Sequence, residues 1–266
     1  GGVQTSIYNA LRSSQSSSPY YNKSTDAYCY IGTEKPNHDV VIVGWDDSYS
    51  KDNFNTDLEG DGAFICQNSW GDNFGENGFF YISYYDTNIG THNVVYTDIE
   101  NTDNYDHIYQ SDLCGWVGQL GYNKDSIYGA NVFTAEGNET LKAASFYATG
   151  KDSQYELYVV RQFEDETSLE KMIPVASGKL GNAGYYTVDF NQGIEVDAGE
   201  RYAVVLYIIT PGSVHPMAIE YAADEATENV DLDDGESYIS ANGSKWVSVD
   251  TVEKSNLCIK AFSDNR

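Results

Sequence analysis

Basic residues and long apolar runs are scarce in this sequence. Lysine and arginine together number 15 among 266 residues, against 41 aspartates and glutamates, so the formal net charge is −26. A surface this acidic repels phosphate backbones and anionic lipids, and we therefore expect no nucleic-acid partner. No apolar run reaches the roughly 18 residues that a transmembrane helix needs, so no membrane span is expected.

Cysteine is also scarce and follows no recognisable spacing. The four cysteines are Cys29, Cys66, Cys114 and Cys258. Three pairings are possible, but the spacing matches neither a disulfide framework nor a zinc site, so we expect reduced thiols, no metal and no cofactor. The acidic stretch at 57–62 begins like a calcium-binding loop, but its twelfth position is Asn68 rather than glutamate, which favours a plain turn.

Tyrosine is abundant, and the apolar runs are short. The chain has 23 tyrosines and 10 phenylalanines. Tyrosine is favoured in strands that have one solvent-exposed face, so the composition predicts a mainly β protein. In the first part of the chain, residues 3–12 fit a short strand or helix, and further strands are expected at 40–45, 62–67 and 78–84. The polar segment 46–61 reads as an insertion.

The pattern changes after an acidic segment without apolar periodicity at 98–107. Short β-rich runs follow, such as "YELYVVRQF" and "RYAVVLYII", and turn residues separate them. Short strands separated by turns in this way are typical of an antiparallel β-sandwich or jelly roll. We therefore predict two domains, residues 1–98 and residues 99–266.

Two stretches of the first domain carry residues suited to catalysis. "NHDVVIVGWDD" places His38 at the start of an apolar run, and "CQNSWGDNFGENGFFYIS" places Asn68 and Trp70 after another. A histidine beside a strand is by itself more often structural. An asparagine at a strand end can accept a hydrogen bond from an imidazole, and a nearby indole can shield that bond from water. This set predicts a catalytic base, its orienting residue and a cover.

The two stretches closely resemble the C-terminal half of papain-family cysteine peptidases. That family has the blocks N/D-H-A-V-x-x-V-G-Y/W and K-N-S-W-G-x-x-W-G-x-x-G-Y, and the resemblance covers about residues 2–98. It implies a papain-like right-hand, β-barrel-like subdomain. It also implies that His38 is the catalytic base, that Asn68 orients it and that Trp70 covers the pair. The implied substrate is a peptide or protein.

Three departures from the family pattern stand out. Asp39 replaces the usual alanine or glycine, and its carboxylate either raises the imidazolium pKa or points to solvent. Phe74 replaces the usual second tryptophan, and the insertion at 46–61 lengthens the separation between His38 and Asn68. None of the three removes a residue to which the resemblance assigns a chemical role.

The nucleophile of the family is not recognisable in this sequence. Papain-like enzymes carry it near the mature N-terminus, roughly 130–150 residues before the histidine. Only Cys29 precedes His38, and its surroundings, "DAYCYIGTEKPNH", lack both the family context and a following helix that would lower the thiol pKa. We therefore expect an N-terminal peptidase half, carrying the cysteine and the oxyanion glutamine, as a partner upstream of this chain.

The second domain also shows a resemblance. "YDHIYQSDLCGW" and "NLCIKAF" look like the lectin-like β-sandwich that follows the papain domain in some bacterial surface peptidases. The resemblance implies an extracellular or cell-surface location in bacteria. Trp116 and Trp246 are candidates for stacking on the sugar rings of a cell-surface glycan, although burial between the sheets is the more common fate of such aromatic residues.

The sequence as a whole predicts the C-terminal portion of a secreted or surface papain-like cysteine endopeptidase, which hydrolyses peptide bonds through a thioester. This chain alone is expected to be inactive. One alternative is a non-catalytic module that binds glycan or cell wall and carries a degenerate peptidase half. Another is a two-chain enzyme whose nucleophile half is separated by proteolytic nicking.

Overall fold

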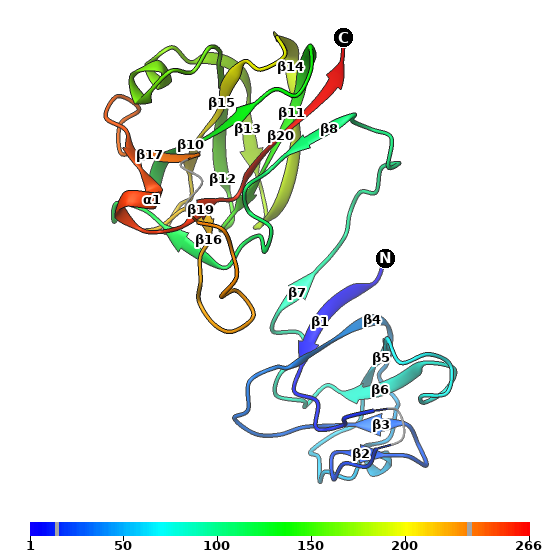
Figure 1. The fold of residues 1–266 in the computed structure, drawn as a ribbon. Coiled ribbons are helices and arrows are strands. Elements are labelled where there is room, and N and C mark those ends of the chain that lie inside the picture. Colours follow the sequence, from blue (N-terminus) through cyan, green and yellow to red (C-terminus); the bar gives the residue numbers. More distant parts are fainter. Residues whose placement is uncertain (14–15, 233–235) are drawn as a thin grey trace. The chain divides into compact units, whose positions relative to one another are not determined.

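The structure divides into two compact units. It is a computed structural model that describes residues 1–13, 16–232 and 236–266 (Figure 1). Contacts within the chain separate Gly1–Glu100 from Asn101–Arg266. Strands dominate both units, so the prediction of a mainly β protein is confirmed. The assignment of residues 1–98 and 99–266 as independent domains stays a prediction.

The first unit is built on one seven-stranded sheet, whose order is β2-β3-β6-β5-β4-β1-β7. Its strands are β1 (Val3–Ile7), β2 (Tyr21–Asn22), β3 (Ala27–Tyr28), β4 (His38–Asp46), β5 (Ala63–Gln67), β6 (Phe79–Ser83) and β7 (Asn93–Val94). Every pairing is antiparallel except the one between β3 and β6. A short 3₁₀ helix, η1 (Lys51–Asn53), lies in the predicted insertion.

The apolar runs form the central strands of this sheet. β4 pairs with β1 on one side, where His38 lies opposite Ile7, and with β5 on the other, where Val41 lies opposite Gln67. One face of the sheet is buried in a cluster that includes Ile7 and Phe80. The catalytic candidates therefore lie at the ends of strands that the core holds in register.

The N-terminal segment differs from the expectation for residues 3–12. Only Val3–Ile7 forms a strand, and residues 8–12 are irregular. The main chain leaves the sheet because side-chain amides take over its hydrogen bonds: Asn37 Oδ1 accepts from Asn9 N, and Asn9 Oδ1 accepts from Leu11 N. Local amide groups compete with ladder hydrogen bonds in this way.

The second unit is a β-sandwich with a small third sheet. The sheet orders are β13-β12-β15-β10-β17-β18, β14-β11-β20-β8 and β19-β16-β9. The strands are β8 (His107–Tyr109), β9 (Gly118–Leu120), β10 (Ser126–Thr134), β11 (Glu139–Ala148), β12 (Ser153–Val160), β13 (Ile173–Leu180), β14 (Gly184–Val196), β15 (Arg201–Ile209), β16 (Met217–Glu220), β17 (Ser237–Ser240), β18 (Val247–Ser248), β19 (Asn256–Leu257) and β20 (Ile259–Asn265). Two helical turns, η2 (Glu166–Glu170) and α1 (Val249–Val252), join them.

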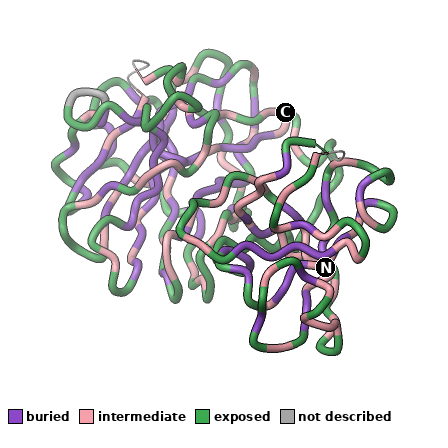
Figure 2. The backbone as a smooth tube through the Cα atoms, turned by 90° about the horizontal axis from the view of Figure 1, so that it is seen from below, coloured by how far each residue is buried: buried purple, intermediate pink, exposed green. Residues whose placement is uncertain are grey.

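Two apolar clusters hold the sandwich together, and Figure 2 shows buried residues along its strands and exposed residues in many of the connecting loops. The larger cluster lies between the six-stranded and four-stranded sheets and contains Leu206 of β15 and Phe146 of β11. The smaller cluster contains Val205 of β15 together with Leu169 of η2. Successive residues of β15 therefore pack alternately into one cluster and then the other, as the two-residue period of a strand requires. No helix in the described parts of the chain is long and apolar enough to span a bilayer.

Candidate active site

His38 and Asn68 meet across neighbouring strands. His38 is the first residue of β4, and Asn68 directly follows β5. Nε2 of His38 lies 2.9 Å from Oδ1 of Asn68, and the asparagine is buried. The pairing of β4 with β5 brings the two residues together although thirty positions separate them in the sequence. The contact expected from the sequence is therefore present.

The hydrogen bonds of Asn68 determine which imidazole nitrogen carries the proton. The backbone N–H of Ser69 donates to the same Oδ1 atom at 2.8 Å, so this atom is an acceptor. Nε2 of His38 must therefore donate to it. Within the described residues Nδ1 of His38 has no hydrogen-bond partner, which leaves this nitrogen available to accept a proton from a nucleophile.

Trp70 packs beside the imidazole and is held by further aromatic rings. The ring centroids of His38 and Trp70 are 5.3 Å apart. Trp70 meets Phe74 edge to face at 5.1 Å, and Phe74 packs in turn against Phe80 of β6 at 5.2 Å. Phe74 is almost completely buried. The phenylalanine that replaces the second tryptophan of the family pattern thus supports Trp70 from the core.

The turn that follows Trp70 depends on a glycine. Gly75 has a φ of +56°, and a Cβ atom at this position would lie 2.0 Å from the carbonyl oxygen of Phe79. Only glycine fits such a close approach in the left-handed region. The turn leads into β6, and the carbonyl of Gly78, just before that strand, accepts a hydrogen bond from the backbone N–H of Asn68. The glycine therefore helps to position Asn68.

The side chains of Asp39 and His38 have different hydrogen-bond partners, although the two residues are neighbours in β4. Successive residues of a strand point to opposite faces. The Asp39 carboxylate is exposed and accepts hydrogen bonds from Ser6 Oγ at 2.7 Å and Gln4 Nε2 at 3.3 Å, both on β1. The carboxylate thus ties β4 to β1, which answers the question that the sequence left open about its direction.

The cysteines of the first unit are buried in its core. All four cysteines of the chain are free in the structure. Cys29 follows β3 and packs with Phe54 and Leu58, and burial raises the pKa of its thiol to about 12. Burial also raises the pKa of the Cys66 thiol. Neither thiol is poised to act as a nucleophile, because the reactive form is the thiolate.

We expect iodoacetamide to leave Cys29 and Cys66 unmodified in the folded chain and to label Cys114, which is exposed. Desolvation and the nearby Glu220 raise the pKa of Cys114, so its labelling should accelerate above neutral pH. Peptide mass spectrometry of native and denatured samples measures the difference. Labelling of native Cys29 that disappears in His38→Ala would contradict the assignment of Cys29 as a core residue.

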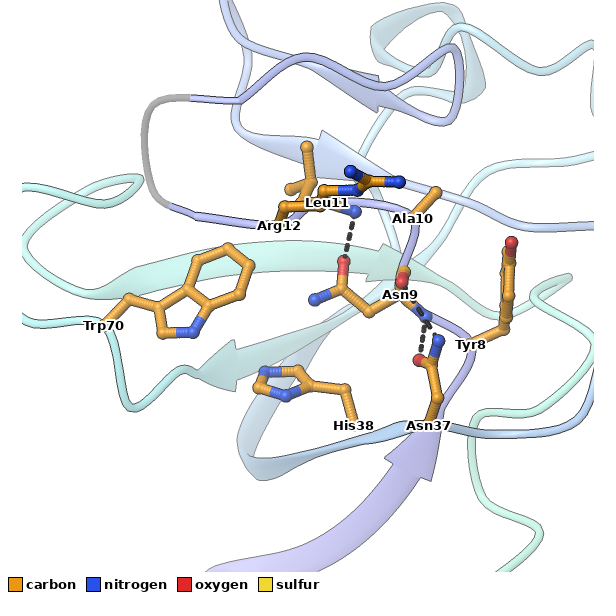
Figure 3. A pocket seen from close by; sticks show the side chains of 8 residues that line it. All are labelled: Tyr8, Asn9, Ala10, Leu11, Arg12, Asn37, His38 and Trp70. Atoms are coloured by element: carbon orange, nitrogen blue, oxygen red, sulfur yellow. Dashed lines mark hydrogen bonds between the residues drawn. The ribbon is translucent and has the colours of Figure 1, made fainter.

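A hollow of about 430 Å³ opens beside the imidazole (Figure 3). Its walls come from the irregular segment after β1, the start of β4 and the turn after β5. The lining residues are Tyr8, Asn9, Ala10, Leu11, Arg12, Asn37, His38 and Trp70. The motifs did not reveal the wall at residues 8–12. The one available signal was Arg12, a solitary cation beside a serine-rich segment of an acidic chain.

Reciprocal hydrogen bonds hold this wall next to His38. Asn37 Oδ1 accepts from Asn9 N at 2.7 Å, and Asn37 Nδ2 donates to the Asn9 carbonyl at 3.2 Å. On the other side, the Asn88 side chain accepts from Tyr8 N at 3.1 Å. The residue before the catalytic candidate therefore also shapes the hollow that the candidate faces.

The two tryptophans predicted to contact sugars lie in different surroundings. Trp116 is 37% exposed and packs on Tyr147 with a centroid distance of 5.7 Å. Trp246 is 8% exposed and belongs to the smaller apolar cluster of the sandwich. The prediction of a sugar contact at Trp246 is wrong, because a buried indole has no free face on which a sugar ring can stack. Trp246 instead packs in the apolar interior, which is the alternative that the sequence also allowed.

No metal site is evident in the parts of the chain that the structure describes. Across residues 1–13, 16–232 and 236–266, no group of three or more His, Cys, Asp or Glu side chains is placed to hold a metal ion. The acidic stretch at 57–62 lies in a turn region where Asp61 accepts a hydrogen bond from the Lys51 amide. Its carboxylate therefore has a structural role.

Comparison with solved structures identifies a relative with the same two parts. The chain superimposes over its full length on the clostridial cysteine protease Cwp84 after propeptide cleavage, with a TM-score of 0.83 and 29% identity. The cysteine protease and lectin-like domains of Cwp84, a surface layer associated protein of Clostridium difficile, give a TM-score of 0.78 and 28% identity, again over the whole chain. This chain spans 66% and 59% of the lengths of those two chains. No curated protein sequence matches it.

Family models divide the chain in the same way. Residues 4–99 match the papain family cysteine protease model, and residues 108–263 match the lectin like domain model. The two matches follow each other without overlap. The chain therefore belongs to the lectin-like domain family, with a papain-family cysteine protease segment in front of that domain.

Proposed function

We propose that this chain supplies the base-carrying part of a bacterial papain-like cysteine endopeptidase. The observation that carries the proposal is the hydrogen bond from His38 Nε2 to Asn68 Oδ1, because it leaves Nδ1 free for a thiol. Trp70 covers one side of the pair. In this arrangement His38 is the base, Asn68 orients it and Trp70 excludes water.

The reaction has two stages. A cysteine thiol gives its proton to Nδ1 of His38, and the thiolate attacks the peptide carbonyl. The imidazolium returns the proton to the leaving amine, which departs and leaves a thioester. The imidazole then takes a proton from water, whose oxygen attacks the thioester carbonyl. The C–S bond breaks and the imidazolium returns the proton to the departing thiolate, which releases the acid and restores the thiol and the neutral imidazole. Asn68 holds the orientation of the ring throughout and keeps the proton on Nε2 whenever the ring is neutral.

The nucleophile in this proposal comes from an N-terminal peptidase half. Cys29 and Cys66 are buried, and Cys114 and Cys258 belong to the second unit. The fraction of the Cwp84 chains that this chain spans is consistent with further residues taking part in the complete enzyme. The direct check is the native coding sequence before Gly1, where a block with a Gln followed by Cys-Trp is expected.

The activity test compares residues 1–266 alone with the same chain after the nucleophile half is added. Hydrolysis of a fluorogenic peptide and labelling by a thiol-reactive epoxide are the readouts. Activity that appears only on addition of the other half supports the proposal, and also the two-chain form of it. Inactivity of the complete protein would favour the alternative, a binding module with a degenerate peptidase half.

An extracellular or cell-surface location is part of the proposal. It is supported by the similarity to Cwp84, which is described as a surface layer associated protein. A surface peptidase would act on peptide or protein substrates outside the cell. Fractionation of the producing cells into cytoplasm, wall and medium tests the location.

Glycan binding by the second unit is a second candidate function. The supporting observation is a row of partly exposed rings: Trp116 packs on Tyr147, and Tyr147 packs on Tyr185 at 5.0 Å. Tyr185 is 44% exposed and its hydroxyl is hydrogen-bonded to Ser145. Aromatic faces beside hydroxyl groups suit the two faces and the rim of a pyranose ring.

If this row binds a cell-surface glycan, Trp116→Ala should weaken the binding at least about tenfold, because stacking on the indole is lost. A glycan array followed by titration measures the effect. Trp45→Ala is the matched control, since Trp45 is a 67% exposed tryptophan of the first unit. Equal losses in both variants, or no binding by the wild type, would leave the sandwich without this function.

A further inference from the structure

Arg12 is an unusual residue to find beside the catalytic candidate. It is one of only 15 basic residues in a chain with a net charge of −26. It is exposed, and it lines the same hollow as His38 and Trp70. Within the described part of the chain it forms no ion pair, whereas Arg161 and Arg266 are both paired with carboxylates. Its charge is therefore available to a ligand.

The rest of the hollow carries no opposing charge. Apart from Arg12 and His38, its lining consists of Tyr8, Asn9, Ala10, Leu11, Asn37 and Trp70. Figure 3 shows His38 at one side of the hollow and Arg12 at the other, with the side chain of Asn9 between them. A substrate group that enters beside the imidazole thus meets a guanidinium and amides but no carboxylate.

A second hollow that also reaches His38 has a mixed character. Its lining includes Lys35, but also Asp39. A cation and an anion in one hollow select no particular charge. Of these two hollows, only the one lined by Arg12 combines a cationic side chain with the absence of a carboxylate.

We propose that the hollow lined by Arg12 binds an acidic side chain of the substrate, an aspartate or glutamate within one or two residues of the scissile bond. The guanidinium presents a planar set of donors that matches a carboxylate. The acidic surface elsewhere repels such a substrate, so attraction is concentrated at this hollow. The inference rests on the proposed function in one respect, because it takes the scissile bond to lie beside His38.

The segment that carries Arg12 is held in place by its neighbours. Asn9 Oδ1 accepts from Leu11 N at 3.0 Å, and Ser16 Oγ accepts from Arg12 N at 2.8 Å. Leu11 is buried in the core of the first unit. The main-chain N–H groups of Leu11 and Arg12 are thus held by hydrogen bonds, which lowers the entropy cost of binding a carboxylate at the Arg12 side chain.

The test measures peptide binding to residues 1–266 and needs no turnover. Blocked peptides that differ only by glutamate or glutamine at one position are titrated while the indole N–H signal of Trp70 is followed by NMR. We expect the glutamate peptide to bind about three- to fivefold more tightly at one position, with the difference shrinking in salt. Arg12→Gln should abolish this preference, and Lys35→Gln, the matched control, should retain it.

Equal binding of both peptides, a preference that persists in Arg12→Gln, or no Trp70 shift at millimolar peptide would each overturn the inference. Cleavage by the complete peptidase is measured separately with the same peptides. Cleavage without an acidic preference removes this inference and leaves the proposed function intact. Arg12-dependent binding to a protein that never cleaves removes the proposed function and leaves the hollow as an acidic-peptide site.

Discussion

Residues 1–266 assayed alone with a fluorogenic peptide are expected to show no hydrolysis above background, and His38→Ala is expected to change nothing. The physical reason is the state of the thiols. Burial holds the pKa of Cys29 at about 12, so the thiolate is rare at neutral pH. Cys29 also packs in an apolar cluster with Phe54, Leu58 and Ala63, away from solvent. A base without a nucleophile cannot form the thioester.

Supplying the nucleophile half should reveal the role of His38. With that half present, His38→Ala is expected to lower kcat/KM by about 10⁴-fold or more, because loss of one member of a catalytic set leaves only binding and oxyanion stabilisation. Asn68→Ala should cause a smaller loss, since the imidazole remains but its tautomer and direction are no longer fixed. Initial rates over a range of substrate concentrations give both values.

Asp39→Asn is the control for this series. Its carboxylate bonds Ser6 and Gln4 on β1, so the variant should retain most of the activity. Turnover by residues 1–266 alone, together with epoxide labelling of Cys29 that requires His38, would refute the prediction. The chain would then be a self-sufficient peptidase with a rearranged nucleophile.

Asp86→Ala is expected to cost the first unit roughly 3–5 kcal/mol of unfolding free energy. The Asp86 carboxylate is 6% exposed and accepts three backbone N–H groups, from Tyr30 at 2.8 Å, Asn88 at 2.9 Å and Ile89 at 3.0 Å. Alanine removes the acceptor and leaves these donors without a partner. Asn88 in turn holds Tyr8, so the wall of the hollow beside His38 should also loosen.

The effect of pH distinguishes the charge of Asp86 from its hydrogen bonds. Burial raises the pKa of this carboxyl above its ordinary value, against the opposing effect of the three N–H groups. The folded state therefore holds the proton more tightly than the unfolded chain. The contribution of Asp86 to the free energy of unfolding therefore increases as the pH falls from the folded-state pKa to the unfolded-state pKa. The same contribution is lost as the pH rises through this range.

Asp86→Asn is the matched variant for this prediction. It keeps one acceptor oxygen and carries no charge, so it should be less destabilising than Asp86→Ala and should lack this pH-dependent component. Hydrogen exchange of amides in β4, β5 and β6 reports the first unit separately from the sandwich. Exchange rates in Asp86→Ala that match the wild type would show that the three N–H groups find other partners.

Most of the catalytic candidate set was predictable because its residues lie within continuous motifs. His38 begins an apolar run and Asn68 and Trp70 follow another, and strand pairing of two such runs brings their ends together. Arg12 and the wall around it were not predictable in the same way. Their positions depend on hydrogen bonds between Asn9 and Asn37, which are remote in sequence and belong to no motif.

The sugar-contact candidates illustrate the same limit. Trp116 and Trp246 both lie near short β-rich runs, and their immediate sequences do not distinguish an exposed ring from a buried one. Whether a ring is covered depends on which segments pack over it. Leu169 of η2 and Phe163 share the cluster that buries Trp246, and both lie far from it along the chain.

The sequence by itself determined the mainly β character of the chain, and its resemblance to known families indicated the papain-type segment and the lectin-like second part. The β character depends on local composition and on the two-residue period of strands, and both resemblances depend on motifs made of neighbouring residues. Only the tertiary structure decided that Asp39 bonds to β1, that Trp246 is buried and that Arg12 lines the hollow beside His38. Each of these depends on contacts between segments distant in sequence, and such contacts are set by packing and register rather than by local pattern.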